Sequence, residues 1–175
     1  MRKLIVLLCA LAACGGEEST KTEQKETKAP RHPEWRMSED PGTAYSVADA
    51  KEELPTEEVV VVGRIRKMVK GFAVFQITDD KLDYCGEVNE NDTCPTPWDY
   101  CCDPQDMVND LTLAVQFEDE NGKPLRADLF GDLRLCDLVA VKGKVTRDDQ
   151  GNVVVHAKSF FRKERPDLPD YVRFP

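Results

Sequence analysis

The stretch DLVAVKGKVTRDDQGNVVVHAKSFFRK, residues 137–163, decides the fold. It holds two runs rich in β-branched residues, 137–146 and 153–162, joined by the polar segment 148–152 with a glycine inside it. Such a pattern predicts two strands and a tight connection between them. In the first strand the residues expected to face inward, between outward-facing lysines, are Val139, Val141, Gly143 and Val145.

The second strand of this pair has two sets of alternating residues. Side chains at every second position of a strand share a face. We therefore expect Val155, Ala157, Ser159 and Phe161 on one face of this strand. The opposite, outward face is then expected to carry Val154, His156, Lys158 and Phe160.

Upstream of this pair the chain shows the same strand signals. The run 58–68, EVVVVGRIRKM, is β-branched and has Gly63 inside it, which is typical of a strand that bends or bulges. Residues 72–78 and 111–117 predict two further strands. Asn121-Gly122 predicts a tight turn into a sixth extended segment, 124–130.

The segments VVVVGRI, FAVFQITDD, LVAVKGKV and GNVVVHAKSF resemble an OB-fold domain over residues 58–162. That resemblance implies an all-β fold, a small five- to six-stranded OB-like antiparallel barrel. The predicted domain covers 58–163, with a cysteine-rich loop insertion at about 81–110, and 164–175 form a C-terminal extension. A disordered tether precedes it.

The N-terminus predicts export. Arg2 and Lys3 precede a short apolar run, as in a signal peptide, here residues 1–13. Leu11-Ala12-Ala13-Cys14 resembles a bacterial lipobox, which implies a diacylglyceryl group on Cys14. Residues 14–57 are rich in charged and polar residues and predict a flexible tether. With Gly15 and Gly16 after the cysteine, the resemblance implies the cell envelope, at the periplasmic face of the outer membrane.

The charge of the chain disfavours nucleic acid as a partner. The full sequence carries 24 basic and 33 acidic residues, a formal net charge of −9, and loss of the signal removes two of the basic ones. Binding to nucleic acid usually needs a basic surface. An OB-like fold keeps nucleic-acid binding as a remote alternative, through basic residues expected to face outward: Arg64, Arg66, Lys67, Lys142, Lys144 and Lys158.

Four cysteines gather in the insertion. Cys85, Cys94, Cys101 and Cys102 follow a C-x8-C-x6-C-C spacing. In an oxidising compartment the favoured interpretation is two disulfide bonds, which join Cys85 and Cys94 to Cys101 and Cys102 in either order. The alternatives are a metal site, because four thiolates suit a soft tetrahedral ion, and thiol redox chemistry.

Two other residues complete the predicted site. Cys136 lies in the apolar segment LRLCDLV and is expected to be buried and unpaired. Trp98 is expected to pack the loop onto the barrel.

The predicted function is that of a non-catalytic envelope lipoprotein. Its OB-like module would present a disulfide-stapled loop to a protein or small ligand, with no cofactor and a lipid anchor as its membrane contact. With two histidines in the whole chain, we expect no catalytic residues and no enzyme activity. The alternative is a metal-binding or thiol-redox lipoprotein centred on the same four cysteines.

Overall fold

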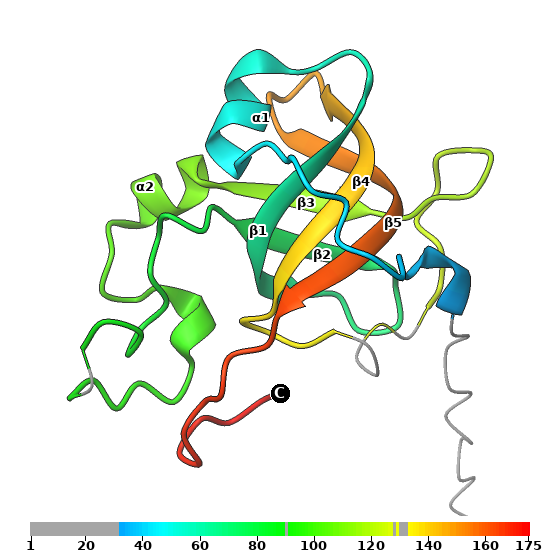
Figure 1. Ribbon diagram of the computed structural model, residues 1–175. Helices are drawn as coiled ribbons and strands as arrows, with labels where there is room; N and C mark the ends of the chain where they lie inside the picture. Colours follow the sequence, from blue (N-terminus) through cyan, green and yellow to red (C-terminus); the bar gives the residue numbers. More distant parts are fainter. Residues whose placement is uncertain (1–31, 90, 128, 130–132) are drawn as a thin grey trace, which may run out of the picture.

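The computed structural model describes residues 32–89, 91–127, 129 and 133–175 (Figure 1). The predicted signal peptide, the lipidation site at Cys14 and the first part of the predicted tether lie outside these residues. Within them, no helix is both long enough and apolar enough to cross a membrane.

Five strands form one sheet that closes in a ring, in the order β1-β2-β3-β5-β4 and back to β1. The strands are β1 (Glu58–Met68), β2 (Val74–Thr78), β3 (Thr112–Gln116), β4 (Leu138–Arg147) and β5 (Val153–Glu164). The prediction of a mostly β fold is therefore confirmed. The expectation of a wholly antiparallel sheet is wrong, because β3 pairs with β5 in parallel and the sheet is mixed.

The β4 and β5 hairpin carries a bulge that changes which residues face the core. Lys142 pairs with Ser159 and the next residue, Gly143, pairs with Ala157, so Lys158 is an extra residue in β5. Beyond the bulge the alternation is reversed. Phe160 is consequently buried, with 1% of its surface exposed, and its predicted place on the outer face is wrong.

The sixth extended segment is also not a strand. Among the described residues of 124–130, pairing is limited to one isolated bridge between Pro124 and Glu118. The predicted turn before it does form, since Asp119 accepts hydrogen bonds from the backbone of Asn121 and Lys123. The turn leads into an irregular segment, and the side chains of Ala127 and Leu129 in this segment are buried in the core.

Residues 32–57 belong to the predicted tether, yet they lie against the sheet. The helix α1 (Val47–Glu53) begins at Ser46, whose hydroxyl accepts the backbone N–H of Asp49. Val47 and Ala50 on this helix are fully buried in the main core. Trp35, in a 3-10 turn (Pro33–Trp35), stacks on Phe117 with ring centroids 4.3 Å apart. The folded part of the chain thus includes these residues.

The core fills the inside of the closed sheet and extends under α1. Its largest fully buried members come from β1, β2, β5 and the connector between β3 and β4: Phe75, Phe117, Phe160, Ile65, Ile77 and Leu133. The cysteine-containing insertion, between β2 and β3, extends to one side of the sheet (Figure 1). The C-terminal segment runs beside it, so both connect to the same side of the closed sheet.

Candidate functional site

The insertion is an ordered loop with a small core of its own. It contains a 3-10 turn (Pro97–Asp99) and the helix α2 (Gln105–Asp110). Leu82, Tyr100 and Val108 form a second buried cluster beside the main core. The sequence shows no periodicity here because the three residues come from three separate parts of the insertion, and only Val108 lies in a helix.

The structure brings the four insertion cysteines together. The sulfur of Cys101 lies 3.9 Å from the sulfur of Cys85 and 3.9 Å from that of Cys94. The sulfur atoms of Cys85, Cys101 and Cys102 all lie within 4.8 Å of one another. Cys101 and Cys102 are exposed to solvent, while Cys85 and Cys94 are partly covered.

The predicted disulfide bonds are not formed in this structure. A disulfide holds its sulfur atoms about 2.05 Å apart, and the five cysteines in the described part of the chain are all free thiols. The physical reason lies in the arrangement: Cys101 is equally far from Cys85 and Cys94, so it is shared between two neighbours rather than paired with one.

The electrostatics of the thiols follow from their burial and mutual proximity. Burial raises the pKa of Cys85 to about 11, although backbone N–H groups of Cys102 and Cys101 directed at its sulfur act in the opposite sense. A negative charge on Cys85 raises the pKa of Cys102. Burial and mutual proximity thus both favour the protonated form of these thiols.

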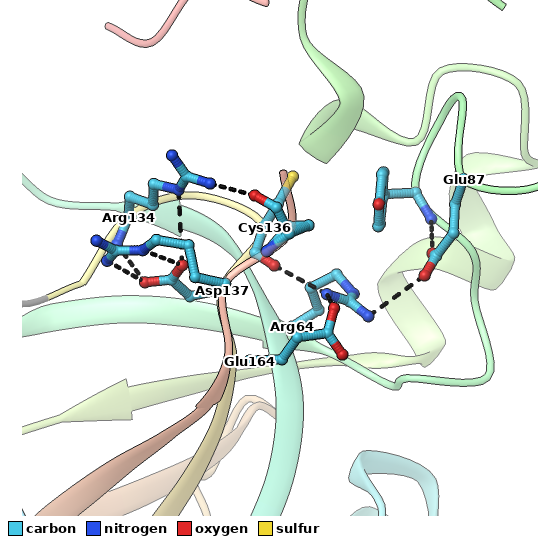
Figure 2. Close-up of polar contacts among 9 residues, drawn as sticks. Arg64, Glu87, Arg134, Cys136, Asp137 and Glu164 are labelled. Carbon is cyan, nitrogen blue, oxygen red and sulfur yellow. Dashed lines mark hydrogen bonds and ion pairs between the residues drawn. The ribbon is translucent and has the colours of Figure 1, made fainter. Parts of the chain in front are cut away.

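Arg64 holds the insertion against the sheet (Figure 2). Its guanidinium donates a hydrogen bond of 3.0 Å to the carbonyl of Cys136, and forms ion pairs with Glu87 at 3.4 Å and Glu164 at 3.5 Å. It also lies over the ring of Tyr84, 5.0 Å from the centroid. One β1 side chain thus joins the insertion, the connector before β4 and the end of β5.

Glu87 links Arg64 to the segment that contains Cys85. One of its carboxylate oxygens faces Arg64, and the other accepts the backbone N–H of Tyr84 at 3.1 Å. Tyr84 immediately precedes Cys85. The position of Cys85 is therefore set from both sides, by Tyr84 and by Glu87.

Trp98 and the C-terminal segment form the second attachment of the insertion. Trp98 is 6% exposed, belongs to the main core and stacks on Phe174 with centroids 5.2 Å apart. The backbone N–H of Arg173 donates to the carbonyl of Pro95, and the hydroxyl of Tyr171 donates to the carbonyl of Asp92. Both acceptors flank Cys94, so the C-terminal segment supports the cysteine loop directly.

Cys136 lies outside the thiol group. It is fully buried, free, and has a backbone φ of +68°, a conformation that residues other than glycine rarely adopt. Burial raises the pKa of its thiol to about 12. The following residue, Asp137, is also buried and accepts two hydrogen bonds from Arg165. Cys136 thus helps form the strained entry to β4 on which Arg64 docks.

The basic outer surface expected from the sequence is reduced. Arg64 is 5% exposed and engaged with the insertion, so its predicted outward position is wrong. His156 bridges the sheet, with Nδ1 at 2.9 Å from Glu118 and Nε2 at 2.7 Å from the hydroxyl of Thr146. Lys158 is paired with Glu58. Arg64 and His156 thus make contacts between elements, whereas the predicted outward positions of Lys142, Lys144 and Lys158 are confirmed, since all three are exposed.

Sequence reasoning did not find Arg64, Glu87 and Tyr84 as residues that position the cysteines. A signal was present, because Arg64 is a charged residue directly after the glycine of a β-branched run. Glu87 and Tyr84 flank Cys85 closely in the sequence. Their contacts with Arg64 form only when the sheet closes, so the sequence pattern alone does not reveal them.

Comparison with known proteins gives no family. No protein-family model matches the chain, and no curated protein matches its sequence. Among solved structures, the OBody AM1L10 bound to hen egg-white lysozyme is similar at 15% identity and a TM-score of 0.43, over 74% of this chain and 100% of that one. A protein assigned as an aspartyl-tRNA synthetase from Leishmania major Friedlin is similar at 11% identity and a TM-score of 0.40. That match covers 76% of this chain and 23% of the synthetase chain. Both similarities are too distant to transfer a function.

Proposed function

We propose that this chain is a lipid-anchored, non-catalytic module of the bacterial cell envelope, whose OB-like closed sheet presents the cysteine insertion to a protein or small ligand. The lipidation signal at Leu11-Ala12-Ala13-Cys14 supports the anchor. The ring order and the parallel pairing of β3 with β5 support an OB-like barrel, a five-stranded Greek-key closure.

One observation carries the binding role: the insertion is firmly attached at its base while its thiols remain accessible. Arg64 is buried against the insertion, and Trp98 is packed into the main core. Cys101 and Cys102 are nevertheless exposed to solvent. A preorganised loop loses little conformational entropy when a ligand binds to it.

The anchor is tested by acylation of the full-length protein in a Gram-negative host. Cells grown with an alkyne-labelled fatty acid are expected to give a labelled wild-type protein that fractionates with the outer membrane. Cys14→Ser is expected to lose the label, because the thiol is the site of diacylglycerol attachment. Cys9→Ser is the matched control, since Cys9 lies within the predicted signal peptide, and it should behave as wild type.

Persistent labelling of the Cys14→Ser protein contradicts the proposed anchor. The orientation of the insertion has its own measurement, alkylation with a thiol reagent that does not cross membranes. Under mildly reducing conditions, Cys101 and Cys102 should react only after the outer membrane is permeabilised. Labelling in intact cells would place the loop on the cell exterior instead.

A further inference from the structure

Spacing and connectivity in the thiol group resemble a metal-thiolate centre more than a pair of disulfides. A tetrahedral ion with metal–sulfur bonds of about 2.3 Å separates its sulfur ligands by about 3.8 Å. The two distances from Cys101, to Cys85 and to Cys94, are each 3.9 Å. One sulfur close to two others at this spacing fits ligands around a common centre, whereas a disulfide uses each sulfur once.

We propose that Cys85, Cys94, Cys101 and Cys102 bind one thiophilic divalent metal ion of the zinc class. Cys85, Cys101 and Cys102 form the compact part of the site, with their sulfurs within 4.8 Å of one another. The sulfur of Cys94 lies 3.9 Å from that of Cys101 but outside this compact group, so Cys94 completes a tetrahedral set only after its side chain turns toward the other three. The proposal specifies the ligand of the insertion and does not depend on the lipid anchor.

The backbone around the cysteines supports this assignment. Tyr100, directly before Cys101, has a φ of +49°, a left-handed conformation that costs a residue with a side chain about 1–2 kcal/mol. This turn leads directly into Cys101, whose sulfur lies 3.9 Å from those of Cys85 and Cys94.

The surrounding fold provides the rigidity that a metal site needs. Tyr100 is fully buried in the small core of the insertion, and Trp98 is anchored in the main core. Arg64, through Glu87, fixes the segment that contains Cys85. Cys85 therefore lies beside residues fixed by Arg64, and Cys101 directly follows a residue fixed by the small core of the insertion.

The binding step balances without any change of oxidation state. Each of the four thiols loses its proton to solvent as a metal–sulfur bond forms, and the ion remains divalent throughout. The complex of four thiolates with one divalent ion carries a net charge of −2. Zinc has no redox chemistry of its own, so the proposed role is to fix the exposed loop in one conformation.

The test uses the full-length protein, purified in detergent without chelators and analysed for metal content and intact mass. The expected result is one zinc-class ion per chain and no gain of hydrogen on reduction. The protein is then reduced, stripped of metal and titrated anaerobically with Co²⁺ as a spectroscopic probe. We expect saturation at one equivalent, with the intense visible bands of tetrahedral cobalt and a thiolate charge-transfer band.

Variants locate the site on the molecule. Cys101→Ser is expected to weaken Co²⁺ binding at least about 100-fold, since loss of even an outer partner of a metal site costs 10- to 100-fold. Cys94→Ser should also remove the tetrahedral thiolate spectrum, because Cys94 is the proposed fourth ligand. Cys136→Ala is the control, because this buried thiol lies outside the group, and it should bind as wild type.

Two results would overturn the proposal, and neither requires a variant to fold. One is a reduced wild-type protein that binds no Co²⁺, or binds it without tetrahedral thiolate bands. The other is a native protein that lacks metal and gains four hydrogens on reduction, the signature of two disulfides. Fatty-acid labelling of the same preparation tests the lipid anchor separately. A negative result for the metal site therefore does not count against the anchor, and a negative result for the anchor does not count against the metal site.

Discussion

Replacing Arg64 by methionine should destabilise the domain and release the cysteine insertion. Methionine keeps much of the apolar volume of the side chain but removes the charge and all donors. The Arg64 side chain is 7% exposed, against 29% for Glu87 and 52% for Glu164. Breaking a buried ion pair by removal of one partner costs about 3–5 kcal/mol. Because both carboxylates are partly solvated, we expect a lower loss, about 2–3 kcal/mol.

The hydrogen bond to the carbonyl of Cys136 accounts for much of this loss. A hydrogen bond that involves a charged group contributes about 1.5–3 kcal/mol, and the buried carbonyl is left without this donor. The assay is urea unfolding followed by tryptophan fluorescence, since Trp98 reports on the insertion and Trp35 on the sheet. Arg66→Met is the matched control, because Arg66 contacts Gln105 at 3.4 Å at the exposed surface. It should change stability by less than about 0.5 kcal/mol.

The effect of pH separates the ionic contribution from simple packing. Burial raises the pKa of Glu87, while the charge of Arg64 lowers it. Without Arg64 this pKa should rise further above its unfolded value, so the folded state binds more protons than the unfolded state. Stability then falls as pH rises through this range and recovers on acidification. The Arg64→Met deficit should therefore be larger at neutral pH than near pH 5. A deficit that equals that of Arg66→Met, or is the same at both pH values, refutes the reasoning.

Two further substitutions test the closed sheet, both by urea unfolding. In Gly143→Ala the added Cβ would meet the carbonyl oxygen of His156 at 2.4 Å and the Cα of Ala157 at 2.9 Å, so we expect a loss of about 2–4 kcal/mol. Ala140→Gly on the same strand should cost only about 1 kcal/mol, and equal losses would disprove the clash. Asp137→Asn places an amide against the Arg165 guanidinium at a fully buried position and should cost about 3 kcal/mol. A loss below about 1 kcal/mol would show that this pair is not needed for folding.

The strands were largely predictable because their sequence signals are local. The run at 58–68 matches β1, and the two runs of the last hairpin match β4 and β5 to within two residues at each end. The faces of β5 were not predictable beyond Ala157, since the bulge depends on how Gly143 approaches β5. The prediction of an extended strand at 124–130 was wrong because a strong turn signal does not guarantee a partner strand for the residues that follow it.

The candidate site was predictable in its composition and not in its arrangement. The spacing of Cys85, Cys94, Cys101 and Cys102 identified the residues, but several pairings and a metal site remained open at that level. The choice between them depends on sulfur positions, which follow from Tyr100 in its left-handed turn and from the docking of Glu87 on Arg64. These are long-range contacts, and alternation within single strands carries no information about them.

The insertion has few buried residues of its own, so its ordered conformation depends on contacts with the rest of the protein and on any ligand that it binds. Among the described residues of the insertion, its own core consists of Leu82, Tyr100 and Val108, so its attachment to the sheet depends strongly on Arg64 and on Trp98. Segments with few buried contacts open locally at a lower free energy than the whole domain. An ion that binds only the ordered loop would oppose this opening, by about 2.7 kcal/mol at a hundredfold excess over its dissociation constant. That gain is comparable to the expected contribution of Arg64, so metal binding and the contacts of Arg64 should stabilise the insertion to a similar extent.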